Sequence, residues 1–402
     1  MGGQRVVIVG ASLAGLRAAE ELRALGHDGT ITMVGDEPHR PYDRPPLSKQ
    51  VLAGTKEPAD AELTVAGGDL DDLQVEWRLG HTATGLDLHD RVVRLGGGER
   101  LPFDGLVIAT GASPKRLPGT DHLSGVHTLR TLDDCLAIRA ALQAGPRRVA
   151  VVGAGFIGAE VAATCRGLGI DVTLIEALPV PLERGLGPVM GAVVADLHRD
   201  HGVDVRLGVG VVRIDGGDGV ERILLTDGTA LDVDLVVVGI GVTPNTGWLE
   251  GSGLTLDNGV VCDATCRAAD GVVAAGDVAR WPNHRFGEVM RVEHWDNAIA
   301  MGEHAARTLL GGAPPEAFAP VPWFWSDQYD RKIQLAGLAG PDDEVAVVSG
   351  SVAERRFVAL YGRDGRVVGV LGVNQPAKVV RWRALVEARR PWDEALAAVA
   401  EG

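Results

Sequence analysis

An α/β fold with two similarly built units is the fold class that this 402-residue sequence predicts. A buried-strand pattern that runs through a glycine loop into a helix occurs twice. Each copy closes with a similar segment, and short apolar strands alternate with helical segments. This alternation is typical of parallel sheets covered by helices.

The first copy opens on the apolar residues 5–9, which the glycine loop 10–15 follows. Residues 13–25 place leucines and alanines on one side and charged residues on the other, which predicts an amphipathic helix. Gly26 suits its C-terminal cap, and a second strand is expected over residues 30–34.

The second copy repeats this order 143 positions later. Residues 148–152 are apolar and lead into the loop 153–158. A helix is expected to about residue 169, and the strand 172–175 ends at Glu176.

The two copies also close alike. Residues 104–114 match residues 234–244, and hairpin-like turns precede them near 96–100 and 227–229. Two units built alike imply two dinucleotide sites.

Each glycine loop has the chemistry of a phosphate cradle. The first glycine makes the turn, the middle position lets the backbone approach a pyrophosphate, and the third lets helix pack on strand. The helix N-terminus adds free N–H groups and partial positive charge. These positions are Gly10, Ser12 and Gly15 in the first loop and Gly153, Gly155 and Gly158 in the second. Glycine-rich turns without a ligand are the alternative, but two loops between strand and helix favour two Rossmann-like domains.

Glu176 indicates which nicotinamide dinucleotide binds the second unit. It lies 23 residues after Gly153, near the offset expected for an acid that binds the ribose 2′-hydroxyl. A carboxylate there favours NAD and repels the 2′-phosphate of NADP. The alternative is a solvated glutamate at a strand end. In the first copy Gly35 stands at this position, followed by Asp36 and Glu37.

Charge and cysteine usage exclude several function classes. The net charge of −15 opposes binding to nucleic acid or to an anionic membrane. No apolar run reaches the roughly 20 residues that a bilayer requires, and no signal peptide is expected. The four cysteines contain no Cys-x-x-Cys pair, so no metal site is expected and a cytoplasmic setting fits best.

Six segments together resemble a known family. They are residues 10–15, 44–49 (RPPLSK), 109–111, 153–160, 275–277 and 323–328 (WFWSDQ). They are similar to the FAD-dependent, NADH-using ferredoxin reductases of bacterial oxygenase systems, the putidaredoxin reductase and aromatic dioxygenase ferredoxin reductase family. The likeness spans nearly the whole chain.

The resemblance implies a glutathione-reductase-like fold with three domains. An FAD-binding domain is expected over residues 1–112 and 241–318, an NAD-binding domain over 113–240, and a C-terminal α/β domain over 319–402. The apolar strand 272–276 supports the insertion, and Asp277 at its end suits a cofactor hydroxyl. An N-cap role for Asp277 is the alternative reading.

The family pattern also assigns cofactor contacts residue by residue. For FAD these are Gly10, Ser12, Ala14, Gly15, Asp36, Arg44, Lys49, Ala83, Arg130, Asp277, Trp295 and Trp323. For NAD(H) they are Gly153, Gly155, Ile157, Gly158, Glu160, Glu176 and Gly241. Core packing is an equal alternative for Trp295.

Lys49 and Glu160 are the pair to which the resemblance gives a catalytic part. It places them beside the reactive edge of the flavin, where a cation stabilises reduced flavin and a paired carboxylate tunes that effect. The alternative for Glu160 is a solvated helix face. Trp323 is expected near the flavin and Trp325 in the core, with Tyr329 in the same aromatic cluster.

The implied activity is transfer of hydride from NADH to FAD and of single electrons to a [2Fe–2S] ferredoxin that supplies an oxygenase. The rivals are an NADH oxidase or peroxidase, which needs a reactive cysteine, and a non-catalytic NADH-sensing flavoprotein. The basic stretch 378–390 is expected to dock the acidic ferredoxin through Arg381 and Arg383, with Trp382 as an anchor. Solvated surface is the alternative, and Arg40, Arg44, Arg331 and Lys332 are competing sites.

Overall fold

A computed structural model of the chain describes residues 4–65, 68–311 and 316–400. These residues fall into two compact units, each assembled from segments that are distant in the sequence. The first unit contains the described residues up to Asp43, Ala61–Ser113 and Thr243–Pro322; the second contains Arg44–Asp60, Pro114–Val242 and the described residues from Trp323 onward. The three-domain boundaries stay a prediction.

A six-stranded sheet forms the centre of the first unit, in the order β19-β20-β7-β1-β2-β3. Strand β1 pairs in parallel with β2 and β7 and is buried along its length, as expected for a strand covered on both faces. The strands are β1 (Val6–Val9), β2 (Ile31–Gly35), β3 (Val75–Leu79), β7 (Gly105–Ile108), β19 (Arg267–Ala269) and β20 (Val272–Ala274). Helices α1 (Leu13–Ala24) and α6 (Trp295–Leu310) pack against each other.

Three smaller sheets contain further residues of this unit. They are formed by β4 (Ala83–Asp87), β5 (Val92–Leu95) and β6 (Arg100–Pro102); by β8 (Ala112–Pro114) and β17 (Val242–Pro244); and by β18 (Val260–Val261), β21 (Ala279–Asn283) and β22 (Glu288–Met290).

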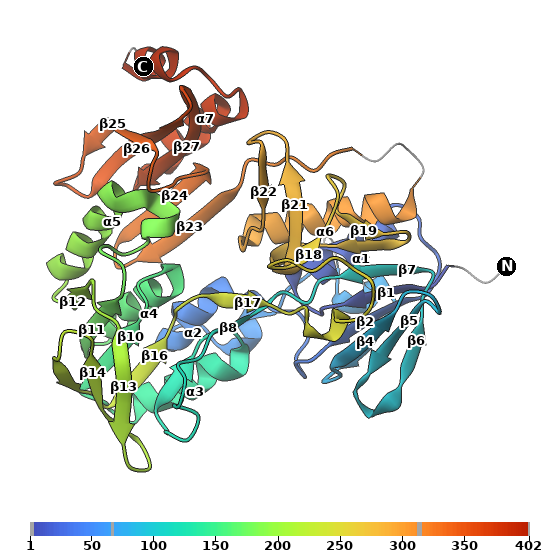
Figure 1. Ribbon diagram of the computed structural model, residues 1–402, viewed down its shortest axis with the longest axis horizontal. Coiled ribbons are helices and arrows are strands. Elements are labelled where there is room, and N and C mark those ends of the chain that lie inside the picture. The colour runs from blue at the N-terminus through green and yellow to red at the C-terminus, as the bar shows by residue number, and fades with distance from the viewer. Residues whose placement is uncertain (1–3, 66–67, 312–315, 401–402) are drawn as a thin grey trace. The chain divides into compact units, whose positions relative to one another are not determined.

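The second unit contains a five-stranded parallel sheet in the order β12-β11-β10-β16-β9 (Figure 1). Its strands are β9 (Val126–Thr128), β10 (Arg148–Val152), β11 (Asp171–Glu176), β12 (Asp204–Leu207) and β16 (Leu235–Val238). A three-stranded sheet follows with β13 (Val211–Gly216), β14 (Val220–Leu225) and β15 (Ala230–Asp232). The helices of this part are α2 (Gln50–Ala53), α3 (Leu132–Gln143), α4 (Phe156–Gly167) and α5 (Glu183–Asp200).

The duplication expected from the sequence is visible in the sheets. The order β7-β1-β2-β3 in the first unit corresponds to β16-β10-β11-β12 in the second, and each sheet has its own three-stranded companion. Even the anchoring of the first strand is repeated. Asp104 Oδ2 accepts a hydrogen bond from the Arg5 N–H at 2.8 Å, and Asp234 Oδ2 accepts one from the Arg148 N–H at 2.9 Å.

A five-stranded antiparallel sheet occupies the C-terminal part of the second unit, in the order β23-β24-β27-β26-β25. Its strands are β23 (Trp323–Gln328), β24 (Arg331–Gly337), β25 (Glu344–Ser351), β26 (Arg356–Arg363) and β27 (Arg366–Val373), and α7 (Pro376–Glu387) and α8 (Trp392–Ala400) follow.

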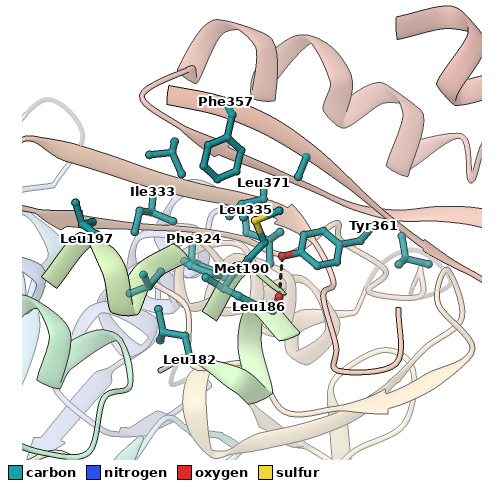
Figure 2. Packing of buried hydrophobic residues seen from close by; sticks show 14 residues of the cluster. Leu182, Leu186, Met190, Leu197, Phe324, Ile333, Leu335, Phe357, Tyr361 and Leu371 are labelled. Atoms are coloured by element: carbon teal, nitrogen blue, oxygen red, sulfur yellow. Dashed lines mark hydrogen bonds between the residues drawn. The ribbon is translucent and has the colours of Figure 1, made fainter. Parts of the chain in front are cut away.

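Helix α5 shares a hydrophobic core with this sheet (Figure 2). Leu186 and Met190 of α5 are buried against Phe324 and Leu371, and the Tyr361 hydroxyl donates to the Leu186 carbonyl at 2.8 Å. Each such buried side chain contributes about 1.5–3 kcal/mol. The core of the C-terminal sheet therefore includes α5, the helix that follows strand β11 of the five-stranded parallel sheet.

Among the described helices, none combines the length and apolar character needed to cross a membrane.

Candidate functional site

The first glycine loop is a tight cradle between β1 and α1. Gly10 has φ +127°, a conformation that other L-residues rarely adopt, and an added Cβ would lie 2.0 Å from the Ala109 carbonyl oxygen. A Cβ on Gly15 would lie 2.0 Å from the Gly10 carbonyl oxygen. Ser12 is the N-cap of α1, but its side chain makes no capping hydrogen bond. The helix end thus keeps backbone N–H groups of the kind that bind a pyrophosphate.

Asp277 is brought to the start of α1 by the neighbouring strand β20. It lies in the 3₁₀ helix Gly276–Val278, and a Cβ added to Gly276 would lie 3.0 Å from the Ala14 Cβ. The N-cap of this short helix is Ala275, so the capping role considered for Asp277 is not observed. Burial lowers the pKa of nearby His294 to about 4, and the Asp277 carboxylate partly opposes this effect.

Three other residues assigned to FAD also lie in the first unit. Asp36 is exposed directly after β2, whereas the neighbouring Glu37 accepts a hydrogen bond from the Tyr42 hydroxyl. Ala83 is the first residue of β4. Trp295 begins α6, and its indole N–H donates to Asp43 Oδ1 at 2.6 Å. Trp295 therefore has a polar anchor, although its contact with FAD stays a prediction.

The second glycine loop has the same geometry as the first. Gly153 has φ +97°, and a Cβ on Gly158 would lie 2.0 Å from the Gly153 carbonyl oxygen. By contrast, a Cβ on Gly155 would meet no atom within 4 Å. Ile157, in the first turn of α4, is 46% exposed. The protein's own packing therefore does not require a glycine at position 155, which is the position where the glycine-loop pattern expects a pyrophosphate to approach.

Glu176 reaches back from the end of β11 to this loop. Its Oε2 accepts the Ala154 N–H at 2.7 Å and its Oε1 accepts the Leu178 N–H at 2.9 Å. The carboxylate is thus fixed beside the glycine loop rather than free in solvent. Gly241 follows β16 with φ +99°, and its carbonyl accepts the Lys115 N–H at 2.9 Å.

Arg44 and Arg130, both assigned to FAD, lie together in the second unit. The Arg44 guanidinium donates to the Arg130 carbonyl at 2.6 Å. The Arg130 N–H donates to Asp134 Oδ2 at 2.9 Å, and the same carboxylate forms a capping box with Thr131 at the start of α3. Helix capping therefore also fixes the backbone of Arg130.

Lys49 and Glu160 form a buried ion pair. The Lys49 Nζ lies 2.9 Å from Glu160 Oε2, and the side chains are 12% and 5% exposed. Glu160 is therefore not a solvated helix-face residue. The Glu160 side chain can be buried among the apolar residues of α4 because Lys49 pairs with its charge.

The aromatic residues of β23 alternate between the two faces of the C-terminal sheet. Phe324 is buried in the core with α5, and its ring lies 4.3 Å from that of Phe156. Trp323 and Trp325 are half-buried on the opposite face. Trp325, which is expected to pack in the core, is only half-buried, because the strand register places Phe324 on the side of α5. The Arg383 guanidinium lies 5.9 Å from the Trp323 ring centroid.

The structure shows contacts that the sequence interpretation missed. Ser48 and Ser326 both donate to the Glu160 carboxylate, and Asp43 binds Trp295. Both serines stand inside segments already singled out, 44–49 and 323–328. Only the tertiary structure shows that their hydroxyls converge on one carboxylate.

The cysteines have no reactive surroundings. All four are free and buried, and burial raises the pKa of Cys135 to about 11 and those of Cys165 and Cys262 to about 12. Within the described ranges, no cluster of His, Cys, Asp or Glu could hold a metal ion.

Comparison with protein families shows which family the chain belongs to. The family described as pyridine nucleotide-disulphide oxidoreductase matches residues 4–302, and the family described as reductase C-terminal matches residues 323–401. The chain belongs to the pyridine nucleotide-disulphide oxidoreductase family. It is an oxidoreductase, and its cofactors are FAD and NAD(H).

Members of this oxidoreductase family resemble the chain over almost its whole length. Rhodocoxin reductase of Rhodococcus erythropolis is 38% identical over 390 residues, 96% of this chain and 90% of that protein. The anthranilate 1,2-dioxygenase system ferredoxin–NAD(+) reductase component of Burkholderia cepacia is 40% identical and covers 95% and 94%. The crystal structure of the covalent putidaredoxin reductase–putidaredoxin complex matches with a TM-score of 0.92, 33% identity and full coverage of both chains.

The residues present fit both cofactors of the pyridine nucleotide-disulphide oxidoreductases. Each glycine loop leaves no room for a side chain at its first and third positions and presents a helix N-terminus. The first loop has Asp277 beside it, and the second has Glu176. Two separate dinucleotide cradles, each with its own acid, are what an FAD site and an NAD(H) site require.

Proposed function

We propose that the protein is an NADH-dependent, FAD-containing reductase that passes electrons to a [2Fe–2S] ferredoxin, which in turn supplies an oxygenase. The observation that carries this proposal is the full-length similarity to reductase components of ferredoxin systems, including the C-terminal part beyond the two nucleotide sheets. The cytoplasmic setting expected from the cysteine usage belongs to the same proposal.

We assign the binding of FAD to the first loop with Asp277 and, following the family resemblance, to Arg44, Lys49, Arg130, Trp295 and Trp323. Bound FAD supplies the chemistry, because it accepts two electrons from NADH and releases them singly. Gly10 and Gly15 admit its pyrophosphate closely, and Lys49 supplies positive charge where the resemblance places the reactive edge. The Glu160 carboxylate at 2.9 Å limits that charge.

We assign the binding of NADH to the second loop. Gly153, Gly155 and Gly158 admit the pyrophosphate, and Glu176 accepts hydrogen bonds from the ribose hydroxyls. A carboxylate held by two backbone N–H groups cannot turn away from a 2′-phosphate, so NADPH is disfavoured.

The peroxidase alternative lacks the reactive thiol that it needs. All four cysteines are buried, and burial raises each thiol pKa, including that of Cys266. Thiolates are the nucleophilic form, so these thiols are unsuited to that chemistry.

The docking of the ferredoxin is assigned to α7. Arg381 is exposed, but Arg383 forms an ion pair with Glu387 at 3.0 Å and lies against Trp323. Trp382 is only 6% exposed because it faces the C-terminal sheet, so the expectation that it anchors the partner is wrong. Arg381 is therefore the residue of this helix best suited to meet an acidic partner.

The test is rapid mixing of the purified yellow protein with NADH, followed by assay with candidate [2Fe–2S] ferredoxins. We expect fast loss of flavin absorbance and transfer of electrons to at least one ferredoxin. A protein that folds but takes up no FAD contradicts the proposal. Slow turnover with every acceptor would instead support the NADH-sensing alternative.

A further inference from the structure

The Glu160 carboxylate is held by four hydrogen-bond donors. Oε2 accepts from the Ser48 hydroxyl at 2.5 Å and from the Lys49 ammonium at 2.9 Å. Oε1 accepts from the Ser326 hydroxyl at 2.8 Å and from the Asp327 N–H at 3.2 Å. An ionised carboxylate can accept all four bonds, so both of its oxygens are fixed.

The Ser326 hydroxyl is itself oriented toward the carboxylate. Ser326 lies on the buried face of β23 and is 0% exposed. The Gln328 amide, also fully buried, donates to Ser326 Oγ at 3.2 Å. A hydroxyl has a single proton, so a hydroxyl that accepts from Gln328 is left to donate to Glu160.

Ser48 is bound by two residues of helix α4, Glu160 and Thr164. Glu160 and Thr164 are one turn apart on α4, and the Thr164 hydroxyl donates to the Ser48 carbonyl at 2.7 Å. Helix α4 therefore fixes the backbone of Ser48 through Thr164 while Glu160 receives its side chain. The segment that carries Lys49 is bound at two points.

We propose that Ser326 and Ser48 are positioning residues for the Lys49–Glu160 pair, and that the C-terminal sheet sets the charge of this pair through Ser326. This inference rests on the proposed function, in which Lys49 adjoins the flavin. Two hydroxyl donors compensate the carboxylate, so more of the Lys49 positive charge acts on its surroundings. Removing one hydroxyl leaves the carboxylate less compensated and makes the pair more negative.

The test is a double-mutant cycle of Ser326→Ala and Glu160→Gln, with two measurements on each of the four proteins. The first is the midpoint potential of the bound flavin. We expect Ser326→Ala to shift it to more negative values, and to have no further effect in the Glu160→Gln background. Ser48→Ala should act in the same direction, whereas Ser351→Ala on β25 of the same sheet should leave the potential unchanged.

The second measurement is the unfolding equilibrium in denaturant, which does not depend on flavin chemistry. A hydrogen bond to a charged group is stronger than one to a neutral amide. We therefore expect Ser326→Ala to raise the equilibrium constant of unfolding in both backgrounds, by a factor that is about ten times larger in the parent protein than in the Glu160→Gln background.

The inference is overturned if Ser326→Ala leaves the potential unchanged, or shifts it equally in both backgrounds. It is also overturned if the two substitutions are additive in the unfolding equilibrium. A parent protein that NADH does not reduce counts against the proposed function alone, because the unfolding cycle still reports on the Ser326–Glu160 contact.

Discussion

At the scale of single residues, the two glycine loops differ in one informative position. The middle residue is Ser12 in the first loop and Gly155 in the second. A serine shows that the first cradle tolerates a Cβ there. The second cradle also has room for one within the protein, so packing does not explain its glycine.

Gly155→Ala should therefore separate ligand binding from stability. No protein atom lies within 4 Å of the added Cβ, so we expect an unchanged unfolding midpoint. We expect the Kd for NADH to rise by about tenfold or more, equivalent to about 1.4 kcal/mol. Gly167→Ala, at the far end of α4 and equally unhindered, is the matched control. Unchanged NADH affinity in Gly155→Ala would contradict the assignment of this loop.

Glu176→Ala should reduce the preference for NADH over NADPH. Loss of a charged hydrogen-bond partner costs about 1.5–3 kcal/mol, so the ratio of kcat/KM values should fall by about tenfold or more. The matched control is Asp171→Ala at the opposite, exposed end of β11. A ratio that is unchanged, or that already favours NADPH in the parent, would show that Glu176 does not discriminate between the ribose 2′-hydroxyl of NADH and the 2′-phosphate of NADPH.

At the scale of elements, an aspartate directly before β7 or β16 anchors the start of the neighbouring strand, β1 or β10, in the two sheets. Asp104 and Asp234 each accept hydrogen bonds from the backbone that starts β1 or β10. The side-chain and backbone hydrogen bonds of Arg5 lower the pKa of Asp104 to about 2. A carboxyl with a depressed folded-state pKa stabilises the fold above its unfolded pKa, and this stabilisation is lost as the pH falls.

Asp104→Asn should accordingly destabilise the protein at neutral pH but not in acid. The pair is well exposed, so we expect a loss of only about 0.5–1 kcal/mol in the free energy of unfolding. The difference from the parent should be constant above about pH 5 and shrink between about pH 4 and pH 2. Denaturant titrations at several pH values measure it. A difference that grows on acidification would contradict this role.

At the scale of the whole molecule, a net charge of −15 has to be reconciled with the proposed docking of an acidic ferredoxin. Local positive charge steers association even when the total charge is unfavourable, and salt screens it. Of the two arginines expected to dock the partner, Arg383 is a poor probe, because it also contacts Trp323 and Glu387.

Arg381→Glu is therefore the sharper substitution. We expect ferredoxin reduction to slow by about tenfold at low ionic strength and the difference to vanish in high salt. Turnover of NADH with ferricyanide should be unaffected. Arg356→Glu, an exposed change of equal charge on β26, is the control. Equal effects of both variants would mean that net charge, not α7, governs the encounter.

The sequence alone determined the duplicated architecture, because strand-loop-helix periodicity and glycine spacing are local properties of the chain. It predicted β1, α1, β10 and α4 closely, and it singled out Lys49, Glu160 and Glu176. Only the tertiary structure decided which partners surround them. The burial of Glu160, its two serine donors and the burial of Trp382 depend on contacts between segments more than 100 residues apart or on the packing of a helix against a sheet. Periodicity says which face of an element is apolar, but not which distant hydroxyl will meet a buried charge.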